Sequence, residues 1–432
     1  MEDPPSRVGA SRNPPTDESS KGAATKAKAQ GFLELGLDPW LVQALAQMTI
    51  HHPTEIQREC IPPTLAGRDI IGGAKTGSGK TAAFALPIIQ KLSEEPFGVF
   101  ALVLTPTREL AFQIADQFRV LGKYIKMRTQ VVVGGADIAT QVASLVNRPH
   151  IVVATPGRLG DLIRTANDAL HLSHLQFLVM DEADRLLGPS FQDDLHLIFD
   201  RIPKKRQTLL YTATMNDTLL SLQNQTEDPA RKPFVHVCPN DIATVSSLVQ
   251  TYVLAPSQVR ETYLFYLLTQ RDLANHSTII FVTKCVSSEL LRLLLRHLKI
   301  KCASLHSQMT LNERRDSVRR FRSGEIPVLI ATDVASRGLD IPTVRLVINY
   351  ELPLDPTTYI HRVGRTARAG LGGRAVSIVS ERDLHLVKQI EERVKCQMQK
   401  QRVVESKVSE FMSFVNTAKR AANMLIGWLQ PA

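Results

Sequence analysis

The run Ala74-Lys75-Thr76-Gly77-Ser78-Gly79-Lys80-Thr81 decides the fold of this chain of 432 residues. An apolar run, 69–73, leads into it, and a helix-like run, 82–92, follows it. A glycine-rich loop between a strand and a helix leaves backbone N–H groups pointing at one spot, beside the positive end of the helix dipole. The run therefore predicts a phosphate-binding loop within an α/β domain.

Two side chains of this loop have expected roles. The Lys80 ammonium is expected to reach the β- and γ-phosphates of a nucleotide, and the Thr81 hydroxyl is expected to hold Mg²⁺. The alternative is a chance turn rich in Gly and Lys, and Ala74 stands where the pattern usually has Gly. Gly-Lys-Thr between a strand and a helix nevertheless makes nucleotide binding the better interpretation.

Length and composition limit the class of protein. A chain of 432 residues that is 44% apolar can bury two cores, and two domains of roughly 200 residues each are the simplest division. No run of about 18 uncharged apolar residues occurs, so no membrane span is predicted. The odd number of scattered cysteines fits neither a disulfide framework nor a zinc spacing and indicates a reducing compartment. These cysteines are Cys60, Cys238, Cys285, Cys302 and Cys396.

The basic excess lies in the second half of the chain. Residues 1–250 hold 25 Lys and Arg against 26 Asp and Glu, a net charge of −1. Residues 251–432 hold 27 against 16, a net charge of +11. A polyanionic partner and a solvated basic surface are equally good interpretations of this charge alone.

The first half reads as alternating helices and strands. Helical segments are expected over 32–48 and 54–66, with Thr54 as the N-cap of the second. Near-continuous apolar runs that alternate with helices predict a parallel, doubly wound sheet, with ligands beyond the carboxyl ends of its strands. The predicted strands are Phe100–Thr105, Thr129–Val133, His150–Ala154, Leu175–Met180 and Gln207–Tyr211.

Polar residues near these strand ends are candidate site residues. Asp181 follows a buried strand and is placed to hold Mg²⁺, and Glu182 beside it can activate the attacking water. The alternative is an acidic helix N-terminus, which the helix dipole also favours.

Two residues of the helical segments could recognise adenine. Gln57 can pair with its edge and Phe32 can stack on it. Taken singly, a Gln is more often a surface residue and a Phe more often a core residue.

A second set of alternating strands and helices predicts a second parallel domain without a phosphate loop. Its basic cluster places His361, Arg362 and Arg365 on one helical face, with Arg368 one turn further on. A guanidinium that reaches a γ-phosphate stabilises phosphoryl transfer, and a surface basic patch is the alternative. The predicted strands are Thr278–Val282, Cys302–Leu305, Val328–Ala331, Leu346–Asn349 and Ala375–Val379.

From Phe32 to about Lys395 the chain resembles the DEAD-box RNA helicases of superfamily 2, whose name comes from the tetrapeptide found here at 181–184. The resemblance implies an α/β fold of two tandem RecA-like domains, each a parallel sheet flanked by helices, with ATP, Mg²⁺ and RNA bound in the cleft between them. The expected division is a disordered tail at 1–30, an ATP-binding domain at 31–239, a linker at 240–250, a second domain at 251–400 and a C-terminal helical extension at 401–432.

The resemblance implies a role for each matching position. The nucleotide-binding residues would be Phe32, Gln57, Ala74, Lys75, Thr76, Gly77, Ser78, Gly79, Lys80, Thr81, Gly338 and Asp340. The catalytic residues would be Lys80, Asp181, Glu182, His361, Arg365 and Arg368, with Arg365 and Arg368 as arginine fingers and with Thr81 and Asp181 holding the metal. Hydrolysis would be coupled to domain closure by Asp184, Thr212 and Thr214.

The implied RNA contacts are small residues and basic side chains, which suit a grip on phosphates and sugars without reading of bases. They are Pro106, Thr107, Arg108, Gly135, Thr155, Gly157, Arg158, Thr283, Arg314 and Thr332. The chain departs from the family pattern at a few positions: Thr212 replaces the commoner Ser, Thr49 and Glu55 differ ahead of Gln57, and Leu311 stands where Gln is usual. None of these departures removes a catalytic position.

The expected function is an ATP-dependent RNA helicase that separates short duplexes locally. The alternatives are an ATP-gated RNA clamp with slow turnover and a DNA-directed relative; a small-molecule kinase or GTPase would not explain the arginines of the second domain. The stretch 331–342 and the short flanks are most similar to nuclear and nucleolar members that act in ribosome assembly. The expected partners are single-stranded or short duplex RNA and a protein activator or pre-ribosomal particle, without a membrane, and the cytoplasm is the other possible compartment.

Overall fold

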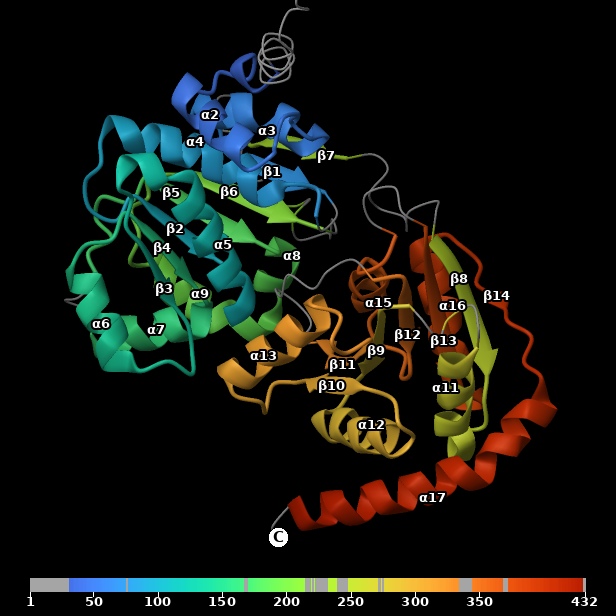
Figure 1. Ribbon diagram of the computed structural model, residues 1–432. Coiled ribbons are helices and arrows are strands. Elements are labelled where there is room, and N and C mark those ends of the chain that lie inside the picture. The colour runs from blue at the N-terminus through green and yellow to red at the C-terminus, as the bar shows by residue number, and fades with distance from the viewer. Residues whose placement is uncertain are drawn as a thin grey trace, which may run out of the picture.

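Two parallel sheets, each covered by helices, form the protein (Figure 1). The structure is a computed structural model, and it describes residues 31–74, 77–166, 170–213, 219, 221, 232–238, 248–270, 273, 276–333, 344–367 and 372–429. Among these residues, no helix combines the length and the apolarity that crossing a bilayer requires. The two parallel sheets confirm the predicted α/β fold.

The first sheet has the strand order β3-β4-β2-β5-β6-β1-β7, and every pairing in it is parallel. Its strands are β1 (Ile70–Gly73), β2 (Ala101–Leu104), β3 (Thr129–Val132), β4 (Ile151–Ala154), β5 (Phe177–Asp181), β6 (Gln207–Thr212) and β7 (Phe234–Val237). Its helices are α2 (Pro39–Gln47), α3 (Glu55–Leu65), α4 (Lys80–Glu94), α5 (Arg108–Leu121), α6 (Ile138–Val146), α7 (Pro156–Thr165), α8 (Ala183–Leu186) and α9 (Gln192–Phe199).

The apolar runs of this sheet are continuous because both faces are covered. Along β2, Ala101 and Val103 belong to the core beneath α2 to α5, whereas Leu102 and Leu104 belong to the core beneath α6 to α9. Successive side chains of a strand point to opposite faces, so a strand that is buried on both sides needs an apolar residue at every position. Because all its pairings are parallel, the carboxyl ends of its strands lie at one common edge, where the polar loops gather.

The second sheet repeats this design with the order β10-β11-β9-β12-β13-β8-β14, again all parallel. Its strands are β8 (Leu248–Leu254), β9 (Thr278–Val282), β10 (Cys302–Leu305), β11 (Val328–Thr332), β12 (Leu346–Asn349), β13 (Gly373–Val379) and β14 (Gln399–Lys400). Its helices are α11 (Arg260–Thr269), α12 (Cys285–His297), α13 (Leu311–Arg322), α15 (Pro356–Val363), α16 (Leu384–Val394) and α17 (Glu405–Leu429). Short 3₁₀ turns span Lys123–Ile125, Pro189–Phe191, Ser257–Val259 and Glu381–Asp383.

Three details differ from the sequence prediction. The helix expected over 32–48 is interrupted, because residues 34–36 form a turn and α2 begins only at Pro39, a residue suited to the first position of a helix. Strands β7, β8 and β14 were not predicted, and β8 begins at Leu248, so the last residues assigned to the linker belong to the sheet. The tail 1–30 and residues 240–247 of the predicted linker lie outside the described residues.

Helix α17 lies along α11 and α12 on the outer face of the second sheet (Figure 1). Val415 and Ala422 of α17 are fully buried in the core of that sheet, and the rings of Phe411 and Phe265 meet edge to face at 5.1 Å. At the rim, the Lys419 ammonium lies 2.7 Å from a Glu261 carboxylate oxygen. The C-terminal segment therefore packs as a helix on the second sheet.

Replacing Val415 by Asp is expected to destabilise the second domain, because a carboxylate without a partner would enter a core position that is fully buried. We expect a loss of about 3 kcal/mol or more in the free energy of unfolding. Ser413→Asp places the same charge on the exposed side of α17 and serves as the control. Equal thermal unfolding of the two variants in calorimetry would show that α17 does not stabilise this domain.

Candidate ATP and RNA sites

The order of the first sheet brings three polar loops together. Strands β5, β6 and β1 are neighbours, with Asp181 opposite Tyr211 and Gly73 opposite Thr212. The phosphate loop therefore starts beside the ends of the strands that carry Asp181 and Thr212. This clustering follows from the parallel order, in which all carboxyl ends lie at one edge.

The phosphate loop leads directly into α4, which begins at Lys80. Gly79 caps the helix in the left-handed region at φ 91°, and a β-carbon there would collide with the Gln57 amide, so both the conformation and the space require glycine. The buried Lys80 ammonium donates a hydrogen bond to the Ala74 carbonyl, across the mouth of the loop. Two predicted residues of this loop, Lys75 and Thr76, lie outside the described residues.

Gln57 is fixed at the first turn of α3. Its carbonyl oxygen accepts a hydrogen bond from the Thr54 backbone N–H at 3.0 Å, and its amide nitrogen donates to the Gly79 carbonyl at 3.1 Å. The prediction that Thr54 is the N-cap of this helix is confirmed. A primary amide has two donor hydrogens and two acceptor lone pairs, so Gln57 keeps one of each for a base edge.

Phe32 is buried in the structure. Its side chain is 1% exposed and belongs to the core beneath α2 to α5. The ring thus packs as a core residue here, and stacking on adenine would require the segment ahead of α2 to shift. Its nucleotide-binding role stays a prediction.

Asp181 and Glu182 lie at the end of β5 as predicted. Asp181 is buried, and burial raises its pKa to about 6 although the nearby Lys80 ammonium acts in the opposite direction. Glu182 is also buried and adopts a left-handed backbone at φ 54°, a conformation that costs energy for a residue other than glycine. A buried carboxylate whose charge is incompletely compensated suits a divalent cation, and Thr81 at the start of α4 offers a neutral oxygen.

The two halves of the protein meet at this site. A carboxylate oxygen of Asp184 lies 3.8 Å from Nε2 of His361, which α15 of the second sheet carries, and both side chains are buried. Thr212 is buried at the end of β6, beside the phosphate loop, and its carbonyl accepts from the Ala74 N–H at 3.0 Å. Asp184 and His361 are therefore brought together from the two domains, and Thr212 lies on the neighbouring strand β6, whereas Thr214 lies outside the described residues.

The basic cluster of the second domain differs from the prediction. Helix α15 ends at Val363 with Gly364 as its C-cap, so Arg365 follows the helix and does not extend its face. Arg365 is buried, and Arg362 is buried and paired with Asp333 within the second domain. The other predicted contacts of this domain, Gly338, Asp340 and Arg368, lie outside the described residues.

Arg362 is the centre of a buried network of contacts within the second domain. Its guanidinium makes a bidentate pair with Asp333, at 2.6 and 2.7 Å. It also donates to the Asn349 side chain at 3.2 Å and to the Glu351 carbonyl at 2.6 Å, and it stacks over Phe281 at 5.2 Å. Sequence reasoning did not identify Asn349 and Glu351, although both stand at or just after the end of a predicted strand, where polar residues collect.

The predicted RNA contacts of the first domain gather on the other half of the sheet, around β2, β3 and β4. The Arg108 guanidinium lies against the turn at Gly134 and Gly135, and Arg158 donates to the Ala136 carbonyl in the same turn at 2.9 Å. Thr107 and Thr155 are the N-caps of α5 and α7, next to Pro106 and ahead of Gly157. The strand order thus separates this surface from the phosphate loop on β1.

The predicted RNA contacts of the second domain are engaged within the protein. Thr283 donates to a Glu351 carboxylate oxygen through both its N–H, at 2.6 Å, and its hydroxyl. Arg314 is buried and forms an ion pair with Glu109 of α5, which belongs to the first sheet. The hydroxyl of Thr332 is buried without a hydrogen-bond partner among the described residues.

Comparison with known proteins identifies the family. Residues 54–222 match the DEAD/DEAH box helicase family, and residues 260–370 match the helicase conserved C-terminal domain. The chain is 50% identical over 402 residues to the ATP-dependent RNA helicase dbp8 of Schizosaccharomyces pombe, covering 91% of this chain and 89% of that protein. This chain belongs to the DEAD/DEAH box helicase family.

Other members of the family agree in sequence and in structure. The probable ATP-dependent RNA helicase DDX49 of Homo sapiens is 48% identical, over 90% of this chain and 81% of its own length. Dbp5 of S. cerevisiae, solved with RNA and ADP BeF3, superposes with a TM-score of 0.75 at 29% identity, over 90% of this chain and 99% of that one. The helicase Mss116, solved with ssRNA and UDP-BeF, gives a TM-score of 0.77 at 30% identity, over 90% and 82%.

In this family member, two contacts from α13 join the sheets away from the phosphate loop. Besides the pair of Arg314 with Glu109, the Arg315 guanidinium lies over the Phe112 ring of α5 at 5.1 Å. Burial raises the pKa of Glu109, with the Arg314 charge opposing this shift. Because both contacts join residues of different domains, they favour the arrangement in which the two domains touch.

We expect Glu109→Gln and Arg314→Ala each to reduce the population of the closed arrangement, because each leaves a buried polar group without its partner. The effects should not add in the double variant, with a coupling of about 1–3 kcal/mol. Fluorescence energy transfer between dyes on the two domains, with RNA absent, measures the population. Strictly additive effects would show that the pair contributes nothing to closure.

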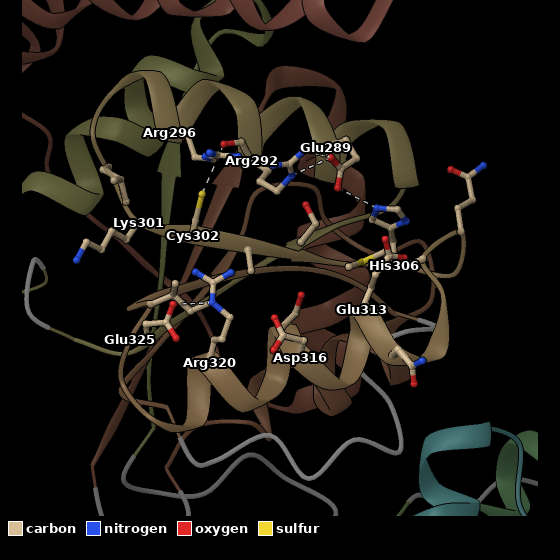
Figure 2. A pocket seen from close by; sticks show the side chains of 18 of the residues that line it. Glu289, Arg292, Arg296, Lys301, Cys302, His306, Glu313, Asp316, Arg320 and Glu325 are labelled. Atoms are coloured by element: carbon tan, nitrogen blue, oxygen red, sulfur yellow. Dashed lines mark hydrogen bonds and ion pairs between the residues drawn. The ribbon is translucent and has the colours of Figure 1, made fainter. Parts of the chain in front are cut away.

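A hollow of about 1060 Å³ lies on the second sheet, where α12 and α13 face each other across the edge strand β10 (Figure 2). Charged side chains line it, and none of the predicted site residues is among them. In its wall, Glu289 contacts His306 at 3.0 Å and Arg292 at 2.6 Å. Burial alone would raise the pKa of Glu289, but the hydrogen bonds from His306 and Arg292 lower it to about 2.

This lowered pKa predicts an acid-sensitive contribution to stability. The folded protein holds the Glu289 charge better than the unfolded chain does, so the stabilisation is complete above about pH 4.5 and disappears as the pH falls toward 2. Glu289→Gln should cost about 1–2 kcal/mol at pH 7, discounted for partial exposure, and progressively less in acid. Urea unfolding at several pH values measures this difference, with the exposed Glu392→Gln as control; a cost independent of pH contradicts the assignment.

Proposed function

We propose that this protein is an ATP-dependent RNA helicase that couples hydrolysis of Mg-ATP to local separation of RNA duplexes or remodelling of RNA–protein particles. One observation carries the proposal. The phosphate loop, the carboxylates at 181–182 and the contact between Asp184 and His361 lie at one edge of the first sheet, where the second domain meets it. A nucleotide bound there would touch both domains.

The residues of this edge divide the chemistry of phosphoryl transfer. The loop N–H groups and Lys80 would hold the phosphates, and Asp181 and Thr81 would hold Mg²⁺, which when bound neutralises charge on the phosphate oxygens. Glu182 would orient the attacking water and take its proton. Arg365 from the second domain, together with Arg368, would stabilise the charge on the γ-phosphate, so a complete site needs the closed arrangement.

RNA would bind across both domains. On the first domain it would lie over the half of the sheet that carries β2, β3 and β4. Arg108, Arg158 and the N-termini of α5 and α7 offer cations and backbone N–H groups to phosphates. Such contacts do not read bases, so binding would be tolerant of sequence and sensitive to salt. The pairing of Arg314 with Glu109 implies that RNA must compete for this arginine.

Coupling follows from the shared preference of both ligands for the closed arrangement. If ATP and RNA each bind the closed form more tightly, each raises the affinity for the other. The contact of Asp184 with His361 supports this proposal, because it joins the loop that carries Asp181 and Glu182 to the second domain. Thr212 and Thr214 would complete the coupling on the side of the first domain.

Unwinding separates this proposal from a clamp with slow turnover. A short RNA duplex with a single-stranded extension should be separated by the wild-type protein with Mg-ATP, and not with a non-hydrolysable analogue under multiple-turnover conditions. Stable, ATP-dependent RNA binding without strand separation would favour the clamp instead.

A role in rRNA processing or ribosome assembly, in the nucleus and particularly the nucleolus, is the finer proposal. It is supported by the similarity of the stretch 331–342 and the short flanks to members that act there, and a protein activator or pre-ribosomal particle would be the partner. Co-sedimentation of the chain with pre-ribosomal particles, abolished by ribonuclease, is the expected result. Sedimentation only as free protein would contradict this assignment.

A further inference from the structure

Three side chains of different chemistry meet at the edge of the first sheet, outside the residues assigned to ATP and RNA. They are Glu55 at the start of α3, His236 of β7 and Cys238 just after β7. Nε2 of His236 lies 3.6 Å from a Glu55 carboxylate oxygen and 3.6 Å from the Cys238 sulfur. One ligand atom from each of the three residues lies within 4.8 Å of those of the other two.

Two of these separations are close to those that a tetrahedral metal ion imposes on its ligands. Zinc binds imidazole nitrogen at about 2.0–2.1 Å, carboxylate oxygen at about 2.0–2.2 Å and thiolate sulfur at about 2.3 Å. At a tetrahedral angle near 109°, these bond lengths place nitrogen and sulfur about 3.6 Å apart and nitrogen and oxygen about 3.3–3.5 Å apart. The observed nitrogen–sulfur distance of 3.6 Å agrees with this value, and the observed nitrogen–oxygen distance of 3.6 Å is slightly longer than the expected range.

We propose that Glu55, His236 and Cys238 bind Zn²⁺, with water as the fourth ligand. Thiolate and imidazole are donors that Zn²⁺ prefers, whereas Mg²⁺ and Ca²⁺ prefer oxygen alone. The site is accessible from one side, since the Glu55 side chain is 48% exposed while Cys238 is buried beneath it. An ion can therefore enter from solvent and bind a sulfur that is held within the protein.

Hydrogen bonding alone explains the cluster less well. The nitrogen Nε2 carries either one proton or one lone pair, so it makes one strong hydrogen bond. Pairing with the Glu55 carboxylate requires the proton, whereas accepting from the Cys238 thiol requires the lone pair. A metal ion satisfies the imidazole, the carboxylate and the thiolate together.

The ion would join two elements that border the phosphate loop. Glu55 lies one residue after Thr54 and two residues before Gln57, which contacts Gly79. The Cys238 N–H donates to the Gly73 carbonyl at 2.9 Å, at the end of β1. Zinc would thus tie the edge strand β7 to the start of α3 and stabilise the first domain, because an ion that binds only the folded state adds its binding free energy to stability.

Cobalt titration of the full-length chain tests this site directly. Tag-free protein, stripped of metal and free of nucleotide, is titrated with Co²⁺ as a spectroscopic substitute for Zn²⁺. We expect saturation at one equivalent, intense visible bands of tetrahedral Co²⁺ and a near-ultraviolet charge-transfer band from thiolate. Added Zn²⁺ should bleach these bands and raise the thermal midpoint of the first domain.

Variants assign the ligands. Cys238→Ser should remove the thiolate band, and His236→Asn and Glu55→Gln should each weaken metal affinity by ~100-fold or more, since even outer-shell changes cost ~10–100-fold. Cys285→Ser, which changes a cysteine of the second domain, should leave the titration unchanged. If Cys238→Ser does not fold, the other two variants carry the test, with circular dichroism confirming that they are folded.

Three results would overturn the proposal. They are absence of saturable binding, a weak octahedral spectrum without a thiolate band, and affinity that is unchanged in His236→Asn. In each of these cases the three side chains form only a polar contact at the edge of the sheet.

Discussion

Glu182→Gln is expected to reduce RNA-stimulated ATP hydrolysis by at least ~100-fold while ATP binding survives. The amide keeps the size of the side chain but cannot take a proton from the attacking water, and general-base catalysis typically contributes ~10²–10⁴ in rate. Glu182 is buried at the end of β5 with a left-handed backbone, so the surrounding structure, and not the carboxylate itself, fixes its position. Turnover with saturating RNA and Mg-ATP measures the effect.

The exposed Glu59→Gln on α3 is the matched control and should hydrolyse ATP at the wild-type rate. Binding of a fluorescent ATP analogue to Glu182→Gln should remain within a few-fold of wild type, which separates loss of chemistry from loss of the site. Hydrolysis that survives in Glu182→Gln would mean that another group activates the water.

Arg362→Met is expected to destabilise the second domain by about 3–5 kcal/mol, because it removes one partner of a buried ion pair. The methionine keeps much of the apolar stem but leaves Asp333 and the Asn349 side chain without the guanidinium that holds them. Calorimetry or urea unfolding of the second domain measures the loss.

Arg393→Met, at an exposed position of α16, is the control for loss of a positive charge. Combining Arg362→Met with Asp333→Asn should recover part of the stability, since no uncompensated carboxylate then remains. A loss below about 1 kcal/mol in Arg362→Met would show that the buried network does not stabilise the domain.

The strands that sequence predicts well are those buried on both faces. For β2, β4 and β9 the apolar run is the signal, and the helices on either side supply the reason for it. Strand β7 is half-buried and β14 has two residues, so neither has a long apolar run. They form because neighbouring strands offer them a pairing edge, which no local pattern records.

The site residues also fall into those that local sequence predicts and those that depend on contacts between distant segments. Positions that a strand end or a helix start fixes, such as Asp181 and Lys80, lie where the sequence places them. Contacts between distant segments were not predicted: Arg362 with Asp333, Arg314 with Glu109 and His236 with Glu55. These contacts depend on how helices and sheets pack together. Helix α15 also ends at Val363, with Gly364 as its C-cap, so Arg365 does not continue its face.

ATP hydrolysis with and without RNA tests the central claim most directly. The wild-type protein is assayed with Mg-ATP alone, with single-stranded RNA and with DNA of the same sequence. The account predicts hydrolysis that RNA stimulates at least several-fold, that falls with rising salt as RNA is released, and that DNA stimulates much less. An ATPase rate that saturating RNA leaves unchanged would contradict the claim that RNA and ATP act together across the two domains.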